Sequence, residues 1–84
     1  MKDIEAFNYN DKGQKHGPSK VFRPNGALQF KGYYINGKQS GLWIWYRENG
    51  NIAFKGNYIN DYQSGLWEFF NGYGQLTFKQ YYIL

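Results

Sequence analysis

Apolar and polar residues alternate in short runs along most of the chain, and the runs end at pairs that contain glycine. The clearest pairs are Asn25-Gly26 and Asn49-Gly50, each between runs rich in Phe, Tyr, Trp, Ile and Val. Alternation with a period of two is typical of β-strands with one buried face, and Asn-Gly between two such runs predicts a hairpin with a type I′ turn. We expect a further hairpin turn at Tyr73-Gly74 and essentially no helix.

The whole pattern recurs every 24 residues. Residues 17–40 read GPSKVFRPNGALQFKGYYINGKQS, residues 41–64 read GLWIWYRENGNIAFKGNYINDYQS, and residues 65–84 read GLWEFFNGYGQLTFKQYYIL. The positions shared by the copies are Gly17/Gly41/Gly65, Gly26/Gly50/Gly74, Leu28/Ile52/Leu76, Phe30/Phe54/Phe78, Lys31/Lys55/Lys79, Tyr34/Tyr58/Tyr82 and Ile35/Ile59/Ile83. A period this short indicates a solenoid, whose units bury their apolar faces by stacking on their neighbours. The sequence therefore predicts an all-β fold, a single-sheet solenoid of tandem antiparallel β-hairpins with a 24-residue repeat.

The repeats account for most of one small domain, residues 1–84. The segment 7–16 resembles the second half of a preceding unit, because Lys12-Gly13 aligns with Asn36-Gly37. It is followed by the repeats 17–40, 41–64 and 65–84. Residues 1–6 fall outside the repeat, and we expect them to be a frayed lead-in.

A loop at Asn49-Gly50 also sets the pairing of the two flanking strands. The expected partners are Arg47 with Ile52, Tyr46 with Ala53, Trp45 with Phe54, Ile44 with Lys55, and Trp43 with Gly56. We expect the Trp43 ring to cover Gly56. The same register places Glu68 opposite Lys79, which is favourable, and Lys20 opposite Lys31, which is mildly unfavourable.

Alternation sorts the side chains onto two faces. One face takes Trp43, Trp45, Arg47, Ile52, Phe54 and Tyr58, and the other takes Ile44, Tyr46, Ala53, Lys55, Asn57 and Ile59. Because Phe, Trp and Tyr make up 23% of the chain, aromatic rings must supply most of the core.

Composition excludes several classes of protein. The chain has no cysteine, so it forms no disulfide, thiolate nucleophile or cysteine-based metal site. The net charge is +4, and its ten basic residues are spread out without a run. No apolar run approaches the length of a membrane span, and Met1 to Asn10 lacks the apolar centre of a signal peptide. We expect a cytoplasmic protein, although a fragment of a secreted or membrane-associated protein would look the same.

The ionisable residues form no recognisable catalytic set. His16 is the one histidine and lies in a predicted turn. The acidic residues are Asp3, Glu5, Asp11, Glu48, Asp61 and Glu68. They fall at turns, in the lead-in or opposite a lysine, so no two are set to share one face at catalytic distance. We predict no catalytic residue, no metal, no cofactor and no enzyme activity.

One surface feature favours a binding function. Lys31, Lys55 and Lys79 share one repeat position, and two strands per repeat would space them about 10 Å apart. The aromatic residues predicted on the same face are Phe22, Tyr33, Tyr46, Phe70 and Tyr81. Such a stripe suits a peptide, a glycan or an anionic headgroup, but solvated lysines over core rings are the more ordinary explanation of the same pattern. Nucleic-acid binding is not expected, since the charge is modest and no arginine cluster exists.

The repeat pattern G-x-W-x-x-Y/F-x-x-x-G-x-l/i-x-F-K-G-x-Y-x-N-G resembles the MORN repeat, most closely the variant common in bacterial proteins. The resemblance covers residues 7–84, and residues 13–17 resemble the G-x-x-H-G turn of the original consensus. The chain departs from the repeat pattern at three places: Ser19 replaces tryptophan, Gln80 replaces glycine, and Asp61-Tyr62 replaces Gly37-Lys38.

The resemblance implies a β-hairpin array that acts as a non-enzymatic recognition or spacer module. Some eukaryotic members are linked to phosphoinositides, and bacterial relatives are often labelled antitoxin components or phosphatidylinositol phosphate kinases. The kinase label does not transfer, because the chain has no nucleotide-binding glycine loop, no catalytic Asp/Asn/Lys set and no room for a kinase domain.

These observations lead to one functional prediction and one alternative. We predict a module for protein–protein interaction or assembly, of which the antitoxin-like partner of a toxin is one form. The alternative is binding of anionic phospholipid or cell-surface glycan through the lysine and aromatic stripe. The apolar segment 78–84 carries no cap, so we also expect a homodimer through the C-terminal edge.

Overall fold

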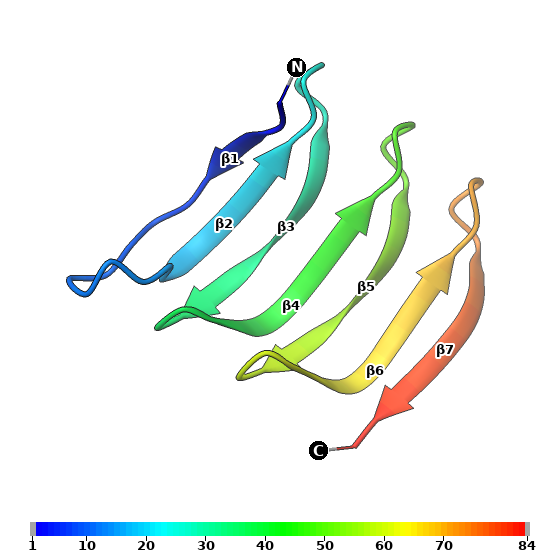
Figure 1. Ribbon diagram of the computed structural model, residues 1–84. Coiled ribbons are helices and arrows are strands. Elements are labelled where there is room, and N and C mark those ends of the chain that lie inside the picture. Colours follow the sequence, from blue (N-terminus) through cyan, green and yellow to red (C-terminus); the bar gives the residue numbers. More distant parts are fainter. Residues whose placement is uncertain (1, 84) are drawn as a thin grey trace.

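The computed structural model describes residues 2–83, which form one antiparallel sheet in which each strand pairs with the next along the chain (Figure 1). The strands are β1 (Ile4–Ala6), β2 (Gly17–Phe22), β3 (Leu28–Ile35), β4 (Lys38–Tyr46), β5 (Ile52–Ile59), β6 (Tyr62–Phe70) and β7 (Leu76–Tyr82). The described residues contain no helix. The sheet measures 41 × 37 × 14 Å, so it is a single layer. The predicted fold class is confirmed.

Tight type I′ turns join β3 to β4 and β5 to β6. They occur at Asn36-Gly37 and Asn60-Asp61, where both central residues have positive φ: 48° and 85° in the first turn, 48° and 72° in the second. Ile35 then faces Lys38, and Ile59 faces Tyr62. This geometry suits the right-handed twist of the strands, and asparagine tolerates it better than most residues.

The hairpin loops at Asn25-Gly26, Asn49-Gly50 and Tyr73-Gly74 are present, but the type I′ geometry predicted for the two Asn-Gly loops is wrong. In the second loop, the Gly50 N–H donates to the Arg47 carbonyl at 2.9 Å, and the Arg47 N–H donates to the Asn51 carbonyl at 2.8 Å. Gly50 has a φ of 90°, whereas Asn49 is not left-handed. The loop is therefore a type I turn followed by a left-handed glycine.

The longer loop changes the pairing next to it. Tyr46 faces Ile52, so the predicted pairs of Arg47 with Ile52 and of Tyr46 with Ala53 are wrong. The predicted pairs further from the loop are confirmed: Trp45 with Phe54, Ile44 with Lys55, and Trp43 with Gly56. The side chain of Asn49 explains the preference, since its Oδ1 accepts the Asn51 N–H at 2.9 Å and closes the turn.

The N-terminal prediction also needs correction. Ile4–Ala6 is a strand rather than a frayed lead-in, and it pairs with β2 so that Ile4 faces Phe22 and Ala6 faces Lys20. Met1 and Leu84 lie outside the described residues. The division into a partial unit and three repeats stays a prediction.

The core is a layer of aromatic rings on one face of the sheet, which we call the core face. One row crosses the sheet from β2 to β7 and consists of Val21, Phe30, Trp45, Phe54, Phe69 and Phe78. Trp43 and Trp67 lie beside this row and are only 1% exposed. Tyr34 and Tyr58 each meet a tryptophan edge-on, with ring centroids 5.1 Å apart. Rings thus bury other rings, which lets a one-layer sheet have a core.

Each buried tryptophan lies on the backbone of the hairpin before it. A methyl group on Gly32 would come within 2.1 Å of the Trp43 ring, and one on Gly56 within 2.0 Å of the Trp67 ring. The prediction that Trp43 covers Gly56 is therefore wrong, although the two residues do face each other in the sheet. A hydrogen bond explains why the Trp43 ring turns toward β3. Its indole N–H donates to the Tyr33 carbonyl on β3 at 3.2 Å.

Candidate functional site

The face opposite the aromatic core carries the predicted lysines, and we call it the open face. One row of facing residues crosses all the strands in the order Ala6, Lys20, Lys31, Ile44, Lys55, Glu68 and Lys79. The predicted facing pairs, Lys20 with Lys31 and Glu68 with Lys79, are both confirmed. Strands about 4.8 Å apart place Lys31 and Lys55 about 10 Å from each other.

The predicted aromatic residues flank this row. The Lys55 Nζ lies 5.8 Å from the centre of the Phe70 ring, a cation–π distance. Phe22 and Tyr46 hold the same repeat position as Phe70 in the other two hairpins. Tyr33 is 42% exposed and Tyr81 67% exposed. The three predicted lysines therefore share one row, and Phe70 lies beside Lys55. A common face for all eight predicted residues, and their role in binding, stay a prediction.

A hollow of about 250 Å³ lies on this face between β2, β3 and β4, and we call it the first hollow. Its lining consists of Pro18, Ser19, Lys20, Lys31, Gly32, Tyr33, Leu42 and Ile44. Sequence reasoning placed Lys31 and Tyr33 in the binding stripe but did not include Pro18, Lys20 or Leu42. The sequence signal that indicates this hollow is the unfavourable pairing of Lys20 with Lys31.

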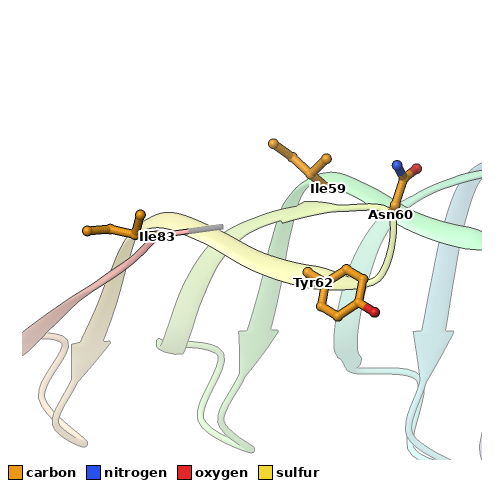
Figure 2. Close-up of a pocket in the computed structure, with 4 residues that line it drawn as sticks. All are labelled: Ile59, Asn60, Tyr62 and Ile83. Carbon is orange, nitrogen blue, oxygen red and sulfur yellow. The ribbon is translucent and has the colours of Figure 1, made fainter.

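A larger hollow of about 500 Å³ lies at the turn between β5 and β6, lined by Ile59, Asn60, Tyr62 and Ile83. Figure 2 shows Ile59 and Ile83 pointing to the same side of the sheet, one from the start of that turn and the other from beyond the end of β7. None of the four residues is charged at neutral pH. This hollow therefore offers apolar contact and the polar groups of Asn60 and Tyr62, but no charge that would select a charged ligand.

Two tyrosines of the core face, Tyr34 and Tyr58, have raised pKa values. Burial raises the pKa of the Tyr34 phenol, and the charges of Asp61 and Glu5 raise it further. Burial also raises the pKa of Tyr58, although a hydrogen bond with the Gln39 side chain lowers it in part. Both hydroxyls are therefore held neutral, the opposite of what a general base or a phenolate nucleophile needs.

His16 has a structural contact. Its exposed ring accepts a hydrogen bond at Nδ1 from the Asn36 N–H at 3.1 Å, which ties the tight turn after β3 to the neighbouring chain segment. Within residues 2–83, no group of three or more His, Cys, Asp or Glu side chains is placed to hold a metal ion. The same residues include no helix of the length and apolarity needed to cross a membrane.

The fold and the open face define a class of protein, an open array of β-hairpins with one packed face and one uncovered face. The model of the MORN repeat variant family matches residues 15–36 and 39–60, more than half of the chain, and the chain belongs to this family. MORN repeats commonly act as modules that interact with proteins or membranes, and the family is generally non-catalytic. No curated protein and no solved structure matches the chain.

Proposed function

We propose that this chain is a non-catalytic module that binds a protein partner through its open face. The observation that carries the proposal is the apolar surface exposed on that face. Tyr33, Leu42 and Tyr81 are 42%, 51% and 67% exposed, and no second layer covers them within residues 2–83. Exposed apolar side chains next to charged ones mark interaction surfaces, and tyrosine is enriched in such interfaces.

The charge pattern favours a protein over a lipid surface. Glu68 lies between Lys55 and Lys79 in the row and would be repelled by anionic headgroups. Anionic membranes typically attract dense clusters of basic residues, whereas Lys31, Lys55 and Lys79 stand about 10 Å apart and Lys31 alone of the three faces a further lysine, Lys20. A protein surface can pair with each charge individually. Binding of a toxin, with this chain as the antitoxin-like partner, is one specific form of the proposal.

Site-specific photo-crosslinking tests the proposal. A photo-reactive phenylalanine analogue would replace Tyr33 or Tyr81 on the open face, and Tyr73, which is 89% exposed in a loop, in the control. The variants are expressed and irradiated in the cells that naturally make the protein. We expect the same discrete protein adduct from each of the two open-face positions and no adduct from the control position. Adducts of the same pattern from all three positions, or none from the open face, would overturn the proposal.

Vesicle sedimentation tests the lipid alternative separately. If anionic lipid is the partner, the chain should sediment with phosphatidylglycerol vesicles at low salt and be released as salt rises. Replacing Lys31, Lys55 and Lys79 together by Gln should then abolish sedimentation. We expect no such lysine-dependent sedimentation, and its appearance would favour the membrane over the protein partner.

A further inference from the structure

We infer that the first hollow is a subsite for an acidic side chain that stands next to an apolar one in the protein partner. The inference rests on the proposed function and names the chemistry that the open face selects. It is carried by three features of the hollow: its uncompensated charge, its apolar walls and its contrast with the next hairpin.

The charge of the hollow is positive and is not balanced within it. Lys20 on β2 directly faces Lys31 on β3, and none of the residues lining the hollow is acidic. Side chains that face each other across antiparallel strands have Cβ atoms about 5 Å apart, so two ammonium groups there repel each other. A carboxylate between them would replace this repulsion with two attractive contacts.

The equivalent place in the next hairpin differs in charge. Ile44 stands at the repeat position of Lys20, and Glu68 stands at that of Ile44. Lys55 therefore faces Ile44 on one side and Glu68 on the other. An acidic ligand gains little there, because a carboxylate of the chain already lies beside the lysine. The repeat thus supplies an internal control for the first hollow.

The walls select an apolar neighbour for the acidic group. Pro18, Tyr33, Leu42 and Ile44 line the hollow together with the two lysines, and its volume of about 250 Å³ suits one or two side chains. Another hollow, equal in volume to the first hollow, shares Pro18 and Lys20 with it. This neighbouring hollow extends to Ala6, Phe7 and Asn8 on the other side of Lys20. An extended segment of the partner could therefore cross β1 to β4 with its acidic residue at Lys20 and Lys31.

A synthetic peptide pair provides the probe. The first peptide is acetyl-Leu-Glu-Phe-amide, and the second has Gln in place of Glu. Titration into the isotope-labelled chain should shift the amide signals of Lys20, Lys31 and Leu42, with weak binding in the range of about 1 mM. We expect the Gln peptide to bind at least about tenfold more weakly, since it lacks the charge that the lysines recognise.

Two variants and a matched control locate the binding. Lys20→Gln and Lys31→Gln should each weaken the acidic peptide about tenfold, equivalent to ~1.4 kcal/mol, while Lys55→Gln should change it less than about twofold. Both hollow variants relieve repulsion, so their melting temperatures should equal or exceed that of the parent chain, which excludes loss of folding as the cause.

The inference fails if the two peptides bind equally, if neither shifts the signals of the hollow, or if Lys55→Gln weakens binding as much as Lys31→Gln. Those outcomes leave the proposed function standing when the open-face crosslinks are still obtained. Loss of the crosslinks with intact peptide binding would instead overturn the proposed function alone.

Discussion

A methyl group on Gly56 would come within 2.0 Å of the Trp67 indole, a distance that no real contact tolerates. Trp67 is 1% exposed and is enclosed by other rings, so it has little space to move away. We therefore predict that Gly56→Ala lowers the free energy of unfolding by about 2–3 kcal/mol, the range of overpacked cores. Denaturant titration followed by tryptophan fluorescence measures the loss.

Gly72→Ala is the matched control for this substitution. Gly72 lies in the loop before β7, has open space where a Cβ would be, and does not need a positive φ. Alanine there should leave stability unchanged or raise it by up to about 1 kcal/mol, because it restricts the unfolded chain. Equal effects of the two substitutions would show that the tryptophan does not rest on the Gly56 backbone.

The tyrosines of the core face predict how stability depends on pH. Burial raises the pKa of both Tyr34 and Tyr58 above the ordinary value near 10, so the folded state favours the neutral phenols. Their contribution to stability is fully present below pH of about 10 and is lost as the pH rises through the folded pKa values. Denaturant titrations between neutral and strongly alkaline pH should show this decline.

The double variant Tyr34→Phe/Tyr58→Phe isolates those two phenols from the other titrating groups. Its stability should be lower at neutral pH, where the Tyr58 hydrogen bond with Gln39 is lost, but should decline less steeply with alkaline pH. An identical slope in parent and variant would mean that the two hydroxyls titrate as they do in the unfolded chain.

At the scale of strands and hairpins, the two arginines of the chain connect successive units. The Arg23 Nη2 donates to the Tyr46 carbonyl at 2.9 Å, and the Arg47 Nη2 donates to the Phe70 carbonyl at 2.8 Å. Both arginines occupy the same repeat position, one residue after the first strand of a hairpin. Each therefore ties its own loop to the equivalent end of the following hairpin.

We predict that Arg23→Met lowers the free energy of unfolding by about 1–2 kcal/mol, because a charge-assisted hydrogen bond to a partly buried carbonyl is lost while the aliphatic packing is kept. Arg47→Met, at an exposed site, should cost about half as much. Lys38→Met, which removes an exposed charge, should change stability by less than about 0.5 kcal/mol. Denaturant midpoints rank the three variants, and equal losses in all of them would contradict a role for these contacts.

The hairpins themselves could be predicted from the sequence because their signals are local. Alternation of apolar and polar residues fixes which face each side chain takes, and Asn-Gly pairs fix where the strands reverse. The turn type could not be predicted in the same way. A two-residue loop satisfies the alternation around Asn49-Gly50 directly, and a three-residue loop satisfies it with the register shift between Trp45 and Tyr46. The Asn49 side chain favours the longer loop, because its Oδ1 accepts a hydrogen bond from the Asn51 N–H.

Contacts between hairpins were less predictable, because they depend on individual hydrogen bonds and register shifts and not on local alternation. Trp43 faces Gly56 within its own hairpin, yet its ring lies on Gly32 because the carbonyl that accepts its N–H belongs to β3. The pairs of the lysine row within each hairpin, Lys20 with Lys31, Ile44 with Lys55 and Glu68 with Lys79, followed from alternation and were predicted. The pairing of Ala6 with Lys20 was not predicted. The first hollow requires the pairing of β3 with β4, whose register shifts between Lys31 and Tyr33, and no repeat pattern within one hairpin reveals that shift.

For the molecule as a whole, the open arrangement of strands leads to a prediction about assembly. Within residues 2–83, β7 pairs only with β6, and the aromatic row of the core face ends on it at Phe78. Phe78 is 56% exposed and Tyr81 67% exposed, and β7 has no proline to block further pairing. Such an edge invites another strand. We propose that two copies of the 84-residue chain pair their β7 strands about a two-fold axis, which would extend the sheet and cover both Phe78 rings.

Light scattering over about a hundredfold range of concentration should show a monomer–dimer equilibrium, since association depends on mass action. Phe78→Lys should shift the equilibrium to the monomer, because two facing lysines would meet across the new strand pair while each side chain stays solvated in the monomer. Tyr73→Lys is the control, as Tyr73 is 89% exposed in the loop before β7 and lies away from the pairing edge. A parent chain that stays monomeric at every concentration, or a Tyr73 variant that dissociates as readily as the Phe78 variant, would exclude association through β7. A dimer that persists in Phe78→Lys would place the interface elsewhere, with the open face the next surface to test.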